Sequence, residues 1–288
     1  MTMQIAVCVK QVIDTQAPLR ILEGTLAVVQ DEPRPVLRMD PAARAALEEA
    51  MALQEHLGAE ITALTVGPPA AEEALRICLA RGVDRALHVI CSDETELDAW
   101  HTSQILAAHL RDLRPDLILC GDRSLDHGSG VVGPTIAELL NLAQITRAVR
   151  LDVQWAAKAL VAWRLLERGD RAIVQTGLPA VVCVMSSANE PRYVSVHRRM
   201  RTLQRPIERV RAYLTEGQTG KLCEIVGIDW PRPRPKKIAL PDASMSAAQR
   251  MQFLMTGGRT KKKEKLFSGS AEEAAERVIE LLQEKGIL

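Results

Sequence analysis

The chain has 288 residues, of which 37 are basic and 36 acidic, so its formal net charge is +1. This balance argues against nucleic-acid binding by the whole chain, and an aromatic content of 3% argues against a surface on which bases stack. The length allows one large hydrophobic core, or one domain with a sizeable appendage.

The cysteines and the apolar runs indicate in which cellular compartment the protein is expected. Six cysteines are scattered along the chain, no two of them in CxxC spacing, and several lie in apolar runs. We therefore expect the reduced, mostly buried thiols of a cytoplasmic protein, and neither a metal site nor a disulfide framework. Lys10 interrupts the first apolar run, which predicts a strand rather than a signal peptide. No run approaches the ~18 apolar residues that would span a membrane.

In the first half of the chain, short apolar runs alternate with stretches of helical spacing. The runs predict strands at residues 4–9, 60–66, 86–90 and 117–120, and the spacing predicts helices at 41–56, 70–81 and 98–113. Residues 14–37 are expected to form an irregular excursion or a hairpin. This alternation is typical of a mainly parallel sheet covered on both faces, so the prediction is an α/β, doubly wound fold.

The second half has a different texture. Residues 148–154, 158–166 and 172–176 alternate like added antiparallel strands, and residues 178–185 read as a buried strand. A polar, basic stretch covers 186–211. After it we expect an extended, proline-rich arm at 231–241, a short helix at 245–255, a mobile basic loop at 257–265 and an amphipathic helix at 270–285. The predicted organisation is a nucleotide-binding α/β domain at 1–230, and an arm, basic insertion and docking helix at 231–288.

Residues 116–140 are the most informative stretch. An apolar run ends at Gly121, a loop with three further glycines follows, and an amphipathic helix begins near Pro134. A helix start presents unpaired backbone N–H groups and a positive dipole end, and glycines let a phosphate approach them closely. The stretch is neither a Walker A motif nor GxGxxG. It is either a nucleotide-phosphate cradle or a glycine-rich turn that closes a βα unit.

Two further junctions should lie near this loop. Residues 8–10 and 66–68, like 120–122, each follow a buried strand. The carboxyl ends of parallel strands meet at one edge of a sheet, which is where ligands bind in such folds. We expect the three junctions to line one site.

Several segments together resemble a known family. Residues 6–15, 46–76, 117–140 and 178–193 are similar to the beta subunit of electron-transferring flavoproteins, and the ending at 270–288 also fits. The run Asn-Glu-Pro-Arg-Tyr at 189–193 is the most specific element. Residues 132–138 look more like the bifurcating and FixA-type branch than the mitochondrial type.

The resemblance implies an electron-transfer subunit rather than an enzyme acting alone, with no catalytic residue and no metal of its own. Such subunits pair with an alpha subunit that carries the redox FAD, and hold a second nucleotide themselves. FAD is expected here, as in bifurcating members, with AMP, as in the simple carriers, as the alternative. Backbone amides of residues 129–132 would hold phosphate. The implied nucleotide site is Cys8, Val9, Lys10, Asp40, Pro41, Ala42, Ala43, Val66, Gly67, Gly121, Asp122, Arg123, Ser124, Asp126, His127, Gly128, Ser129, Gly130, Val131, Val132 and Gly133.

The resemblance also implies protein partners. Besides the alpha subunit, these are an acyl-CoA dehydrogenase-type flavoprotein and a downstream acceptor, such as a quinone-linked or iron–sulfur oxidoreductase. The implied partner-binding residues are Ala188, Asn189, Glu190, Pro191, Arg192 and Tyr193. Arg192, Arg198, Arg199 and Arg201 either guide an acidic partner or form an ordinary solvated face.

Some positions depart from the family pattern. Asp40 stands where Asn is usual, which would put a carboxylate near an adenine or ribose. Residues 127–131 lack the polar side chains usual in bifurcating members, and Ala188 replaces a Leu that normally anchors the dehydrogenase partner. A stand-alone adenine-nucleotide-binding regulatory module of universal-stress-like type is the alternative function.

Individual side chains in the loop have two interpretations each. Lys10 either neutralises a phosphate or is a surface lysine, and His127 either bonds the ligand or is simply solvated. Arg123 either pairs with a phosphate or braces the loop through Asp126. Asp126 itself is expected to orient the loop backbone rather than to perform acid–base chemistry. Cys8 and Cys120 are expected to be small apolar fillers near the nucleotide, not redox thiols.

Overall fold

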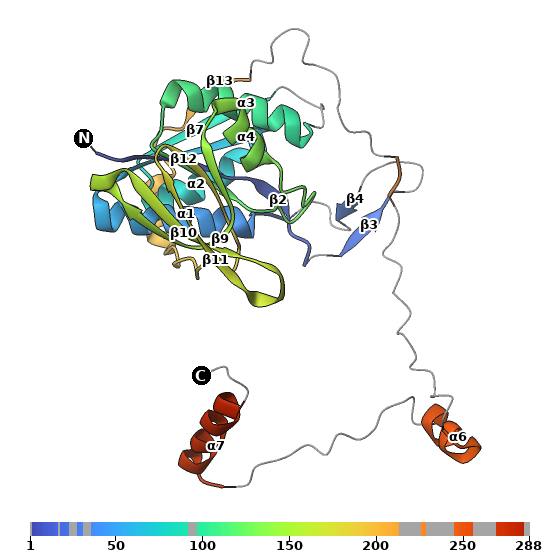
Figure 1. Ribbon diagram of the computed structural model, residues 1–288. Helices are drawn as coiled ribbons and strands as arrows, with labels where there is room; N and C mark the ends of the chain where they lie inside the picture. Colours follow the sequence, from blue (N-terminus) through green and yellow to red (C-terminus); the bar gives the residue numbers. More distant parts are fainter. Residues whose placement is uncertain are drawn as a thin grey trace. The chain divides into compact units, whose positions relative to one another are not determined.

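The computed structural model describes residues 2–16, 18–22, 28–30, 36–91, 97–212, 226–228, 245–255 and 269–284. The chain divides into two compact units, Met1–Asp229 and Trp230–Leu288, and each is described by itself. Figure 1 shows the sheet and helices of the first unit in blue to light orange, and the two helices of the second unit, α6 and α7, in orange and red.

The described strands of the first unit form a nine-stranded sheet with the order β11-β10-β9-β12-β8-β1-β6-β7-β13. The strands from β9 to β13 in this order run parallel, whereas β10 and β11 extend the sheet in antiparallel pairing. This confirms the α/β fold with an added antiparallel segment. The bounds are β1 Gln4–Cys8, β6 Glu60–Gly67, β7 Arg85–Ile90, β8 Leu117–Gly121, β9 Ala143–Gln154, β10 Ala159–Leu165, β11 Arg171–Gly177, β12 Ala180–Val184 and β13 Glu208–Arg211.

Helices cover both faces of this sheet. Successive side chains of a strand point to opposite faces, so β1 contributes to two cores. Ile5 and Val7 lie in the core beneath α1 and α2, and Ala6 and Cys8 lie in the core beneath α3 and α4. The bounds are α1 Pro41–Leu57, α2 Glu72–Arg81, α3 Ala99–Leu113, α4 Val132–Leu140 and α5 Val196–Thr202, with short 3-10 turns η1 Pro69–Ala71, η2 Trp155–Ala157 and η3 Glu167–Gly169.

Residues 14–37 contain the expected hairpin. Strands β3 (Leu19–Ile21) and β4 (Val28–Gln30) pair in antiparallel fashion, and β2 (Gln11–Ile13) pairs with β5 (Leu37–Met39). The second ladder returns the chain to the end of β1, so that α1 begins beside Lys10. Its start follows the sequence signals, because Asp40 caps the helix and Pro41 occupies the first turn.

The starts of two elements differ from the sequence prediction, and two further elements were not predicted. The helix after the glycine loop begins at Val132 rather than near Pro134. Strand β9 begins at Ala143 rather than at residue 148, because its first part pairs with β12 before its second part pairs with β10. The basic stretch at 186–211 contains α5 and the edge strand β13. The sequence of β13, ERVR, holds one apolar residue and so carries no strand signal.

The second unit contains the two helices expected there, α6 (Ala247–Met255) and α7 (Ala271–Glu284). Helix α7 starts with a capping box: Glu273 N–H donates to Ser270 Oγ at 3.2 Å, and Ser270 N–H donates to Glu273 Oε2 at 3.0 Å. The arm expected at 231–241 and the basic loop expected at 257–265 lie outside the described residues.

Candidate functional site

The candidate site lies at the carboxyl edge of the sheet, where β1, β6 and β8 end. In this register Cys8 stands opposite both Leu64 and Cys120, so the three strands finish side by side. The start of α1 packs against the end of β8. A Cβ atom at Gly121 would lie 2.8 Å from the backbone N of Ala43, so only glycine fits there. The fold thus brings together the predicted site residues at 8–10, 40–43 and 121–133.

Asp40 joins these three segments. Its carboxylate is 2% exposed. Oδ2 accepts the N–H groups of Ala42 at 3.0 Å and Ala43 at 3.1 Å, and Oδ1 accepts the N–H of Leu125 in the glycine loop at 2.7 Å. The Asp40 N–H donates to the carbonyl of Lys10 at 2.9 Å. Both carboxylate oxygens are therefore engaged by the protein, and this residue acts as a clamp within the site.

An ion pair closes the same loop over the end of β1. Lys10 Nζ lies 2.7 Å from Asp126 Oδ2, and Asp126 Oδ1 accepts the N–H of His127 at 2.7 Å. Partial burial acts to raise the pKa of Asp126, but hydrogen bonds from Lys10 and Ser124 and the charge of Lys10 outweigh it and lower the pKa to about 2. Asp126 is thus an ionised group that orients the loop backbone, and Lys10 is paired within the protein.

Two exposed side chains flank this ion pair. Arg123 lies 3.9 Å from Asp122 and does not brace Asp126, and its side chain is 70% exposed. The His127 ring lies 3.4 Å from Asp126 and is 72% exposed. Both side chains are accessible to a ligand, and a binding role for each stays a prediction.

The start of α4 presents free backbone donors. Its N-cap residue is Val131, which offers no capping side chain, and its first turn contains no acidic residue. Within the described chain, the N–H groups of Ser129, Gly130 and Val131 donate to no carbonyl or side chain. Gly128 and Gly130 have φ values of 61° and 67°, which favour glycine. A loop of unpaired amides at an uncapped helix start fits a phosphate group.

Three cysteines lie under this helix start. Cys8, Cys120 and Cys183 occupy equivalent positions on three adjacent strands. The contact with Cys8, together with burial, raises the pKa of Cys120, and burial raises the pKa of Cys183. The Cys120 and Cys183 thiols are therefore protonated, and all three cysteines are small, buried side chains beneath the helix start. Among the described residues, no group of His, Cys, Asp and Glu side chains could hold a metal ion.

The end of β6 forms the far rim of the site. Gly67 has a φ of 155°, and its carbonyl accepts the N–H of Cys91 at 3.3 Å and contacts His88 Nε2 at 3.2 Å. The buried His88 is a residue that the sequence analysis missed. A single histidine in an apolar strand carries no signal of such a contact.

The segment expected to bind a protein partner is partly fastened to α1. Asn189 Nδ2 donates to the Ala45 carbonyl at 3.0 Å and to Glu49 Oε1 at 2.7 Å. Arg192 Nε donates to Glu48 Oε1 at 2.7 Å, and its guanidinium also pairs with Glu55. The hydrogen bonds that Arg192 donates to Glu55 and Glu48 raise its pKa.

The rest of this region faces outward. Ala188 packs against the core and Glu190 is exposed. Tyr193 is 84% exposed, and Val196, Met200 and Leu203 continue an exposed apolar strip along α5. This strip was not recognised in the sequence, because three apolar residues among arginines resemble a buried helix face.

Comparison with known proteins agrees with this architecture. Residues 28–214 match the model of the electron transfer flavoprotein domain. The chain is 36% identical to the electron transfer flavoprotein subunit beta of Bacillus subtilis, over 72% of this chain and 78% of the relative. It is 31% identical to the protein FixA of Azotobacter vinelandii, over 83% and 88%. It is 34% identical to the caffeyl-CoA reductase-Etf complex subunit CarD of Acetobacterium woodii, over 71% and 77%. In the described parts of the chain, no helix is both long and apolar enough to cross a membrane.

Proposed function

Because this chain belongs to the electron transfer flavoprotein family, we propose that it is the beta subunit of a heterodimeric electron carrier that holds an adenine nucleotide at the start of α4. Family membership supports an electron-transfer role. The nucleotide, the partners and the cytoplasmic location are the further steps of this proposal.

The observation that carries the proposal is the loop of free amides at residues 129–131, held by Asp40. An anion bound there would meet backbone N–H groups and the positive end of the α4 dipole, and no capping side chain competes for them. Lys10 and Asp126 neutralise one another, so the amides supply the attraction. The clamp keeps the donors in place before the ligand arrives, which reduces the ordering cost of binding.

We propose FAD as the nucleotide, with AMP as the alternative. FAD supplies the redox chemistry when it is bound. The protein's residues bind and orient it: the amides of Ser129, Gly130 and Val131 hold phosphate, and the ends of β1 and β6 meet the rest of the nucleotide. The buried cysteines beneath exclude water from the sheet side of the site.

The proposed partners follow from the exposed strip and from relatives. Tyr193, Val196 and Met200 form an apolar strip beside exposed Arg198 and Arg201, which suits a protein surface with an apolar pocket and acidic rim. Relatives are named as subunits of an acryloyl-CoA reductase and of a caffeyl-CoA reductase-Etf complex. We propose an alpha subunit as the permanent partner, an acyl-CoA dehydrogenase-type flavoprotein as donor and a quinone-linked or iron–sulfur oxidoreductase as acceptor.

The test is the nucleotide content of the complex. The chain is co-expressed with its alpha subunit, the heterodimer is purified and denatured, and the released nucleotides are separated by chromatography. Two FAD per heterodimer would support a flavin in this chain, and one FAD with one AMP would replace FAD by AMP. A heterodimer that carries a single FAD and no second nucleotide would refute the nucleotide site, and a stable monomer with bound ATP would favour a stand-alone regulatory module.

A further inference from the structure

His88 is a buried polar side chain that belongs to neither of the two hydrophobic cores on the faces of the sheet. It is 1% exposed on β7, and its Nε2 atom lies 3.2 Å from the carbonyl oxygen of Gly67 at the rim of the nucleotide site. A carbonyl can only accept, so Nε2 carries the proton in this contact. The other ring nitrogen, Nδ1, is buried without a hydrogen bond.

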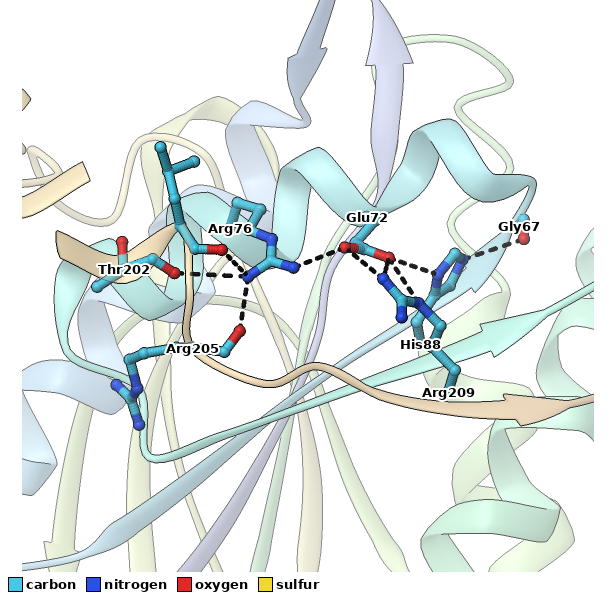
Figure 2. Close-up of polar contacts among 8 residues, drawn as sticks. Gly67, Glu72, Arg76, His88, Thr202, Arg205 and Arg209 are labelled. Atoms are coloured by element: carbon cyan, nitrogen blue, oxygen red, sulfur yellow. Dashed lines mark hydrogen bonds and ion pairs between the residues drawn. The ribbon is translucent and has the colours of Figure 1, made fainter. Parts of the chain in front are cut away.

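Glu72 faces that second nitrogen. Its Oε2 atom lies 4.0 Å from His88 Nδ1. Two arginines hold the carboxylate in place: Arg76 from the same helix at 2.8 Å, and Arg209 from β13 at 2.8 Å. Figure 2 shows Glu72 between Arg76 and Arg209, and the His88 imidazole between Glu72 and Gly67.

The arginines connect this cluster to the segment after α5. Arg76 donates to the carbonyls of Leu203 at 3.0 Å and Arg205 at 2.6 Å, as well as to Glu72 (Figure 2). Burial acts to raise the pKa of Glu72, but hydrogen bonds from Arg209 and Arg76 and their charges lower it. An ionised Glu72 therefore stands at a fixed place beside the imidazole.

The contact with His88 restrains the turn at Gly67, where the backbone is otherwise free to move. Gly67 has a φ of 155°, and glycine populates this region about as readily as others, so its backbone is easily displaced. A Cβ at this position would lie 3.3 Å from the Ala71 side chain. Among the described residues, the carbonyl of Gly67 accepts from the N–H of Cys91, which follows β7, and from His88. Losing one of the two donors would let the end of β6 take other conformations.

We propose that His88 is a positioning residue that fixes the Gly67 carbonyl, and so the turn from β6 to η1, at the rim of the nucleotide site, while Glu72 and its two arginines lie against the other side of the imidazole. The inference rests on the proposed nucleotide function. Its consequence is that nucleotide affinity depends on a hydrogen-bond donor at the place of Nε2, since a preformed rim binds with less ordering cost.

A pair of substitutions tests this role. The amide nitrogen of Gln reaches the place of Nε2, whereas that of Asn reaches only the place of Nδ1. We expect His88→Asn to raise the Kd for AMP and for FAD about tenfold, the worth of one hydrogen bond, and His88→Gln to restore it to within about twofold. The Kd is measured by calorimetry on the full chain in complex with its alpha subunit, after removal of bound nucleotide.

The control is Arg85→Ala, which breaks an exposed ion pair between Arg85 on β7 and Glu208 on β13. These strands also carry His88 and Arg209, whose contacts this substitution leaves intact. It should bind like the wild type. His88→Asn with wild-type affinity, or His88→Gln as weak as His88→Asn, would overturn the inference. A wild-type complex that binds neither AMP nor FAD would instead overturn the nucleotide function itself.

A second measurement does not depend on the variants folding. In the wild-type complex, ¹⁵N NMR of the histidine rings reports which nitrogen of His88 carries the proton. The inference expects a protonated Nε2. An unprotonated Nε2 would contradict it, because the contact with the Gly67 carbonyl would then be absent.

Discussion

Asp40 Oδ1 accepts the backbone N–H of Leu125 at 2.7 Å, across 85 positions of sequence. The same carboxylate caps α1 through Oδ2, so one buried side chain ties the helix start to the glycine loop. Asp40 therefore restrains the glycine loop against the start of α1.

Replacing Asp40 by Asn should separate its two roles. Asn has one acceptor oxygen, so it can cap α1 or accept from Leu125, but its NH₂ group cannot do the other task. We expect Asp40→Asn to lower the free energy of unfolding by about 1–2 kcal/mol and to weaken AMP binding. Urea unfolding and calorimetry of the full chain measure the two effects.

Asp98 provides the matched control for this substitution. It caps α3 through the N–H of His101 at 2.8 Å, a contact within the first turn of that helix. Asn caps helices as well as Asp does, so Asp98→Asn should leave AMP binding unchanged. Equal losses of AMP affinity in the two variants would contradict the clamp role of Asp40.

The ion pair between Lys10 and Asp126 predicts a dependence of stability on acid. The pKa of Asp126 is lowered from 3.8 to about 2, so the folded state favours the ionised carboxylate. Its stabilising effect is present above the ordinary pKa and is lost as the pH falls from about 4 towards 2. The melting temperature of Asp126→Asn should therefore fall less than that of the wild type across this window. Parallel curves for the two proteins would show that the pair does not stabilise the fold.

Gly133 should tolerate no side chain. A Cβ atom there would lie 2.3 Å from Cys183 Sγ, so α4 would have to move away from β12. We expect Gly133→Ala to cost about 1–3 kcal/mol in urea unfolding, because overpacking strains a close-packed interior. Adding Cys183→Ala should recover part of that loss. Gly177→Ala is the control, since the nearest atom to its Cβ lies at 3.9 Å, and a similar loss there would exclude this explanation.

The proposed partner-binding segment at residues 188–193 should separate into a residue that holds it in place and a residue that meets the partner. Arg192 pairs with Glu48 and Glu55, so Arg192→Ala should lower the free energy of unfolding by about 1–2 kcal/mol. Tyr193 is 84% exposed, so Tyr193→Ala should unfold like the wild type and yet slow reduction of the complex by an acyl-CoA dehydrogenase. A Tyr193→Ala complex reduced at the wild-type rate would place the partner elsewhere.

The sequence predicted those parts of the fold that depend on local patterns. Alternating apolar runs and helical stretches identified the parallel strands, and Asp-Pro at 40–41 marked the start of α1. The glycine loop was found because several glycines between a buried strand and a helix start are typical of a loop that a ligand can approach closely. Edge strand β13 was missed, since its pairing with β7 rests on the backbone and its side chains are mostly charged.

The parts of the site that escaped prediction depend on contacts between distant residues. Nothing local indicates that the second oxygen of Asp40 is occupied by Leu125, or that His88 reaches Gly67. Arg192 seemed available to a partner because a basic cluster looks the same in sequence whether or not acidic residues of a neighbouring helix face it. In this structure Glu48 and Glu55 of α1 do so.

The central claim is that amides of the loop at residues 129–131 hold the phosphate of an adenine nucleotide. Hydrogen–deuterium exchange of the heterodimer, with its second nucleotide removed and then restored as AMP, tests it most directly. The account predicts that AMP slows exchange in the peptides covering residues 122–135, more than anywhere else in this chain. Bound AMP with unchanged exchange in these peptides would contradict the claim.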